Sequence, residues 1–80
     1  GDGYADQKIE VPHVVGMEQD EADILLTGLG LTVGQIITEP SSAPAGSVIR
    51  QRPAAGSDNK IRIGAPVDLW VSAGGGSIEE

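Results

Sequence analysis

The spacing of apolar residues along the chain changes at Gly30. Before this glycine, apolar residues recur every three or four positions, at Ala22, Leu25 or Leu26, and Leu29. This period is typical of an amphipathic α-helix. Acidic side chains occupy the first turn, where the helix macrodipole favours them, and Gly30 stands where helices commonly end. The pattern predicts a helix over roughly residues 18–29.

After Gly30 the helical spacing gives way to three stretches that indicate β-strands, and apolar and polar residues alternate most clearly in the last of them. The predicted strands cover roughly residues 33–38, 47–52 and 66–72. In the last strand, Val67, Leu69 and Val71 alternate with Asp68, Trp70 and Ser72. We expect the first set to face the core and the second to face away from it. Short loops between the strands favour an antiparallel sheet, and a helix with one apolar stripe covers one face of it.

Two further stretches are predicted to carry neither the helix nor these strands. Residues 9–17 begin as extended chain, because Pro12 disfavours helical geometry in the residue before it. Residues 53–65 are predicted to be mostly turn, with Gly56 and Gly64 as hinges.

Both ends of the chain resemble linkers, so we expect tails at 1–9 and 75–80 around a single domain at 10–74. We interpret the chain as a piece of a longer protein whose targeting signals lie outside the piece. No apolar run approaches the roughly 20 residues that cross a bilayer, and no signal peptide is visible. There is no cysteine, so a disulfide framework and a thiolate metal site are excluded.

The net charge of −7 argues against a nucleic-acid partner, because phosphate binding needs a basic face. The charges are unevenly distributed along the chain. Acids crowd the start of the predicted helix, at Glu18, Asp20, Glu21 and Asp23, and basic residues gather in the second half, at Arg50, Arg52, Lys60 and Arg62. The basic region of the domain therefore contains Arg50 and Arg52.

Seven short elements resemble, in order and spacing, a PASTA domain, the small module named for penicillin-binding proteins and serine/threonine kinases. They are VPHVVGM, Ala22 with Leu26, GLTVG, PAGSV, QRPAAG, IGAPV and VSAG. Each element alone is unspecific, whereas their joint order and spacing are specific. The chain departs from the family pattern at His13, where an acid is usual, and at Glu18, where a serine usually starts the helix.

The resemblance implies an α+β fold in which one α-helix packs on a three-stranded antiparallel β-sheet, as the apolar pattern also predicts. It implies an extracytoplasmic module of the bacterial cell envelope, with tandem sister domains in the parent chain. It further implies recognition of peptidoglycan fragments (muropeptides), with β-lactams as mimics in penicillin-binding proteins. The rival interpretation is a structural spacer or self-association domain without a ligand, because some members of the family resemble spacers.

The stretch RQRPAAGS carries the candidate ligand-binding residues. Gln51, Pro53 and Gly56 belong to the family pattern and are expected to be architectural. Arg50 and Arg52 are not fixed by that pattern, and strand alternation places them on the same side of the sheet. Two guanidinium groups there can hold the carboxylates of a peptide stem.

Trp70 completes the candidate site, because it alternates away from the residues expected in the core. Its flat apolar face can stack on a sugar ring. The alternative is that Ile36, an arginine stem or the N-terminal segment with Tyr4 covers it. For the two arginines, the alternative is ion pairing with Glu39, Asp68 or the acidic helix start, as is usual for surface charges.

No set of residues for catalysis or for holding a cofactor can be assembled, so we expect a non-enzymatic domain. His13 is the single histidine, and a metal site or general base needs partners that it lacks. The serines have no nearby histidine to activate them. DEAD at 20–23 matches a helicase motif by letters only, because the phosphate-binding GxxxxGK is absent.

Overall fold

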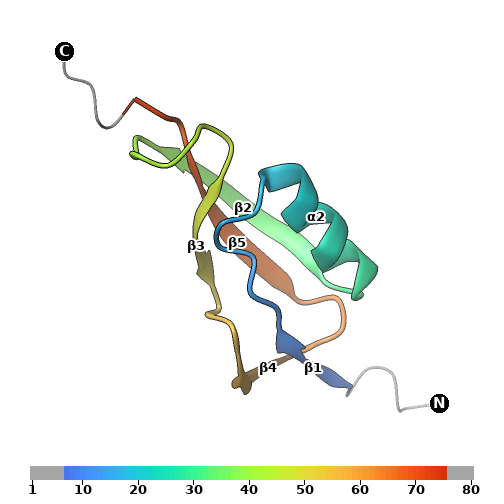
Figure 1. Cartoon of the computed structure of the whole chain (residues 1–80). Coiled ribbons are helices and arrows are strands. Elements are labelled where there is room, and N and C mark those ends of the chain that lie inside the picture. Colours follow the sequence, from blue (N-terminus) through green and yellow to red (C-terminus); the bar gives the residue numbers. More distant parts are fainter. Residues whose placement is uncertain (1–6, 76–80) are drawn as a thin grey trace.

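The computed structural model describes residues 7–75, apart from the side chain of Ser57. Its central sheet has the strand order β2 (Thr32–Glu39), β5 (Pro66–Ser72) and β3 (Val48–Arg52). Helix α2 (Gln19–Gly28) lies along one face of this sheet (Figure 1). Strands β1 (Lys8–Val11) and β4 (Gly56–Arg62) pair as a separate two-stranded sheet at one end of the molecule.

The predicted helix and the three predicted strands are confirmed, with ends that agree to within one residue. The α+β class with a helix on a three-stranded sheet is therefore also confirmed. The helix ends as expected at Gly30, which has a φ of 91°. The amide of Gly30 donates to the carbonyl of Thr27 at 3.0 Å, and that of Leu31 donates to the carbonyl of Leu26 at 2.9 Å. These two bonds close the last turn and direct the chain into β2.

The expectation of a wholly antiparallel sheet is wrong, because the sheet is mixed. Strand β3 runs antiparallel to β5, whereas β2 runs parallel to it. The last strand in the sequence occupies the centre, between two strands that follow one another along the chain. Of the strands described, β5 has the most buried side chains, and at the centre of the sheet each of its edges pairs with a neighbouring strand. A short connection indicates that two consecutive strands run in opposite directions. It does not indicate whether a later strand lies between them in the sheet.

The expectation that residues 53–65 are mostly turn is also wrong. Strand β4 lies within this stretch and pairs antiparallel with β1, with Lys8 opposite Arg62 and Glu10 opposite Lys60. Its sequence, GSDNKIR, has a single apolar residue, Ile61, which is half-buried. A strand that buries so little carries no alternating pattern, so its pairing could not be inferred from hydrophobicity.

The core lies between α2 and the sheet. Its buried side chains come from α2, from β3 and β5, and from the segments before and after α2. They are Val14, Ala22, Leu26, Leu31, Val48, Val67, Leu69 and Val71. Of the two alternatives for the helix stripe, Leu26 is fully buried and Leu25 is half-buried. Leu69 has no exposed surface, which confirms the predicted register of β5. Burying one such leucine stabilises the fold by about 1.5–3 kcal/mol.

Candidate ligand-binding face

The three candidate residues lie together on the face of the sheet that the helix does not cover. Arg50 and Trp70 are cross-strand partners of β3 and β5. The guanidinium carbon of Arg50 lies 4.6 Å from the centroid of the Trp70 ring, and that of Arg52 lies 5.6 Å from it. Both distances are within the range of cation–π attraction. We call Arg50, Arg52 and Trp70 together the arginine–tryptophan cluster.

An irregularity in β3 places both arginines on this face. Val48 pairs with Val71, and Arg50 pairs with Trp70, so the register shifts between Val48 and Arg50. One extra residue in a strand resets the alternation of side chains beyond it. As a result Val48 is buried on the core side, while Arg50 two residues later is exposed on the other face.

Gln51, between the two arginines, is buried and holds the chain that enters the domain. Its side-chain oxygen accepts a hydrogen bond from the amide of Val14 at 2.9 Å. Its side-chain nitrogen donates to the carbonyls of Pro12 at 2.8 Å and Pro53 at 3.2 Å. Gln51 is therefore architectural, as expected, and it fixes the backbone from which the arginines project.

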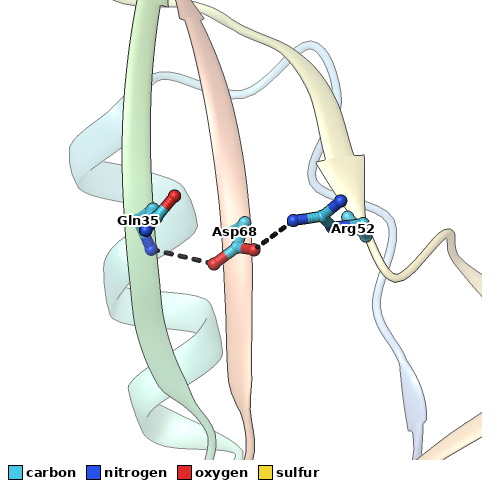
Figure 2. A network of polar contacts seen from close by, with 3 residues as sticks. All are labelled: Gln35, Arg52 and Asp68. Carbon is cyan, nitrogen blue, oxygen red and sulfur yellow. Dashed lines mark hydrogen bonds and ion pairs between the residues drawn. The ribbon is translucent and has the colours of Figure 1, made fainter.

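Asp68 links the three strands through polar contacts, as Figure 2 shows. One of its carboxylate oxygens accepts a hydrogen bond from the backbone amide of Gln35 in β2, at 2.9 Å. The other accepts from Nη2 of Arg52 in β3, at 3.2 Å. The Gln35 amide, followed by the hydrogen bond from Arg52, lowers the pKa of the Asp68 carboxyl below its usual range. Of the ion pairs considered from the sequence, this one is formed.

Gly34 makes room for the Asp68 carboxylate. Strand β2 has an irregularity here, because the register with β5 shifts between Val33 and Ile36. A Cβ atom on Gly34 would overlap Oδ1 of Asp68 and would lie 3.2 Å from Cβ of Pro66. The close approach of the carboxylate therefore requires glycine at this position. The sequence indicates Asp68 only as an ion-pair candidate and gives no expected role to Gly34.

Trp70 is half-buried, and the guanidinium groups account for part of its cover. Ile36, another candidate cover, lies opposite Leu69 in the register, whereas Ile37 lies beside Trp70. Tyr4 lies outside the described residues. Among the three alternatives considered for covering Trp70, the structure supports an arginine side chain. A sugar ring would therefore have to stack beside or in place of a guanidinium group.

The arrangement is chemically suited to a carboxylate. A guanidinium group that stacks through its flat face keeps its N–H groups at the edge, where they can donate in pairs to two oxygens. Hollows at the helix surface suit an anion less well, because Glu18 and Asp20 line one of them and Glu21 lines another. The arginine–tryptophan cluster is therefore the better candidate for an anionic ligand.

Two further features of residues 7–75 concern metal binding and membrane crossing. His13 is exposed, and no group of three or more His, Cys, Asp or Glu side chains is placed to hold a metal ion within this range. Over the same residues, no helix has the length and apolar character needed to cross a membrane.

Within residues 7–75, one helix on a mixed three-stranded sheet, with a small accessory sheet at one end, defines an α+β module. The chain belongs to the PASTA domain family, whose sequence model matches residues 9–73. It is 46% identical over 66 residues to a "Probable serine/threonine-protein kinase" of Corynebacterium efficiens, covering 81% of this chain and 10% of the relative. It is 37% identical over 71 residues to another of Clostridium perfringens, covering 89% of this chain and 10% of the relative.

Solved structures lead to the same family. The extracellular region of the Ser/Thr kinase PrkC from Staphylococcus aureus matches with a TM-score of 0.74 and 29% identity, covering 81% of this chain and 23% of that one. A three-PASTA-domain structure of a Ser/Thr kinase from the same organism matches with a TM-score of 0.70 and 29% identity, covering 81% and 32%. The chain thus spans about a tenth of the curated relatives and less than a third of the structure matched with three such domains.

Proposed function

We propose that this domain is a non-catalytic, extracytoplasmic module that recognises peptidoglycan fragments (muropeptides) within a larger bacterial cell-envelope protein. The observation that carries the proposal is the stacking of two guanidinium groups on the single tryptophan of the chain. The similarity to kinases, one of them represented by its extracellular region, supports the placement and the presence of sister PASTA domains in the parent chain.

In this proposal the arginine–tryptophan cluster receives a carboxylate of the stem peptide. Trp70 holds the guanidinium groups in place, so less freedom is lost when a ligand binds. A domain this small offers little concave surface, so the affinity of one domain is expected to be weak, on the order of 1 mM. Sister domains raise the apparent affinity through effective concentration. β-Lactams, which also carry a carboxylate, belong to the same class of ligand.

An NMR titration with soluble muropeptides tests the proposal. We expect shifts at Arg50, Arg52 and Trp70 that weaken as salt rises and that are lost in Arg50→Ala and Trp70→Ala. Arg62→Ala is the matched control, because Arg62 is an exposed arginine of β4. Absence of shifts at several times the expected dissociation constant, or shifts confined to the acidic helix, contradicts the proposal. Pure domain is expected to show no turnover of any fragment.

The rival function, a spacer without a ligand, also has support in the structure. The guanidinium groups already cover part of Trp70, and the net charge of −7 opposes binding of anions in general. Strand β1 and the end of β5 lie at opposite ends of the molecule (Figure 1), so successive copies can follow one another along a line. The titration separates the two functions, because a spacer shows no shifts at the arginine–tryptophan cluster.

A further inference from the structure

The two arginines of the cluster differ in what they already bind. Nη2 of Arg52 donates to Oδ2 of Asp68 at 3.2 Å, in the ion pair shown in Figure 2. Within residues 7–75, no carboxylate lies within ion-pair distance of Arg50, whose guanidinium group is stacked on Trp70. As far as residues 7–75 are concerned, a carboxylate ligand therefore meets one occupied and one open guanidinium group.

The carboxylate that occupies Arg52 is held from its other side as well. Oδ1 of Asp68 accepts a hydrogen bond from the amide of Gln35, and Gly34 leaves the space in which this oxygen sits. The side chain of Asp68 is 21% exposed, compared with 70% for Arg52. The aspartate is thus the fixed member of the pair, and Arg52 is the member that a ligand would have to draw away.

We propose that Asp68 is a built-in carboxylate that occupies Arg52, so that the cluster binds ligands through one carboxylate, at Arg50. This inference rests on the proposed function and specifies how its ligand is held, through a single carboxylate. Asp68 is in this view a specificity-determining residue, because it occupies the second guanidinium group that a dicarboxylate would need. It also adds a negative charge next to the site, which disfavours a second anionic group.

Replacing Asp68 by asparagine should make the guanidinium group of Arg52 available to a ligand without disturbing the strand. Asparagine has the same shape, and its side-chain oxygen can still accept the hydrogen bond from Gln35. Arg52 then loses a charged partner while keeping its contact with Trp70. The α-carbons of residues two apart in a strand are separated by about 7 Å, so a flexible six-carbon diacid can reach both guanidinium groups.

Hexanoate and adipate are the matched probes, because both have six carbons and they differ in having one or two carboxylates. For the wild-type domain we expect the two dissociation constants to agree within about twofold, the statistical advantage of two equivalent ends. For Asp68→Asn we expect the preference for adipate over hexanoate, given by the ratio of the two dissociation constants, to rise about two- to fivefold above its wild-type value. This is the contribution of one additional solvent-exposed ion pair, between the second carboxylate and Arg52. Amide shifts at Arg50, Arg52 and Trp70 provide the measurement.

Two controls isolate the role of Asp68. Asp23→Asn removes the same charge from the exposed surface of the helix and should leave the ratio of the two dissociation constants unchanged. Adding Arg52→Ala to Asp68→Asn should abolish the gain for adipate. The inference is overturned if Asp68→Asn leaves the ratio unchanged, if Asp23→Asn changes it equally, or if neither probe shifts the cluster in Asp68→Asn.

The muropeptide titration distinguishes a failure of this inference from a failure of the proposed function. Muropeptide shifts at the cluster together with an unchanged probe ratio in Asp68→Asn contradict the inference alone. Absence of muropeptide shifts in the wild-type domain contradicts the proposed function, even where the simple carboxylates bind.

Discussion

The guanidinium group of Arg50 lies over the indole ring of Trp70, and the two residues are direct cross-strand partners. The contact therefore depends on the register of β3 against β5, which is shifted by the extra residue between Val48 and Arg50. Without that shift, alternation from Val48 would place Arg50 on the core side of the sheet. The irregularity is thus what creates the arginine–tryptophan cluster.

The stacking predicts a change in the emission of Trp70 when Arg50 is removed. In Arg50→Ala we expect the emission to shift to longer wavelength, because water replaces the guanidinium group on the ring. The free energy of unfolding should fall by only about 0.5–1 kcal/mol, as is usual for an exposed cation–π contact. Fluorescence is a clean measurement here, because Trp70 is the only tryptophan of the chain.

Arg62→Ala is the control for this prediction, since Arg62 is an exposed arginine of β4. It should leave the emission maximum where it is. An unchanged maximum in Arg50→Ala would mean that the stacked arrangement is not populated in solution.

The sequence predicted α2 and β5 because each buries apolar side chains at regular spacing. Leu26 and Leu69 illustrate this, since both are fully buried where their spacing indicated. β2 and β3 were predicted from their apolar residues as well, although β2 has no fully buried side chain and Val48 is the one fully buried apolar side chain of β3. β4 was missed because a strand with only Ile61 as an apolar residue carries no pattern. The parallel pairing of β2 with β5 was missed because it depends on which strand takes the centre, a long-range property that local spacing does not carry.

The candidate site was predictable only in part. Strand alternation placed Arg50 and Arg52 on one side, and the structure brings both to Trp70. The role of Asp68 was not predictable, because it requires β2, β5 and β3 to lie side by side in one particular register. The glycine in LTVGQ was the one available signal, since a glycine inside a strand often marks a bulge or a close approach.

Leu69→Ala should test the core most directly. Leu69 has no exposed surface, so its truncation leaves a cavity under α2, and we expect the free energy of unfolding to fall by about 2–5 kcal/mol. The matched control is Ile24→Ala, because Ile24 is 71% exposed on the helix and its truncation should change stability by less than about 0.5 kcal/mol. Urea denaturation measures both. Equal effects of the two substitutions would show that the register of β5 is wrong.

The lowered pKa of Asp68 predicts a loss of stability in acid. Because the folded state binds its proton less readily than the unfolded chain, the stabilisation is fully present above the unfolded pKa, about 3.9, and is lost as the pH falls through the lower folded pKa. We expect the melting temperature of the wild-type domain to exceed that of Asp68→Asn near neutral pH. The difference should shrink in acid, and a difference that stays constant would contradict this linkage.

The start of α2 offers a gain in stability. Glu18 has the extended backbone of an N-cap residue, with φ of −69° and ψ of 151°, but its side chain makes no capping hydrogen bond. Serine at this position can accept from the amide of the third helical residue, Glu21, whose carboxylate can accept in turn from the amide of residue 18. We expect the capping hydrogen bonds of Glu18→Ser to contribute about 0.5–2 kcal/mol to the free energy of unfolding, relative to alanine at this position.

The control for this last prediction is Glu18→Ala, which removes the same charge and offers no capping oxygen. Loss of the acid near the helix start costs about 0.3–1 kcal/mol in either variant, because the macrodipole favours negative charge there. Serine should therefore be the more stable of the two substitutions, and the difference between them isolates the cap. Thermal unfolding of the three proteins decides the matter. Equal stability of Glu18→Ser and Glu18→Ala would mean that backbone contacts already satisfy this end of the helix, such as the bond from the amide of Gln19 to the carbonyl of Gly46 at 2.9 Å.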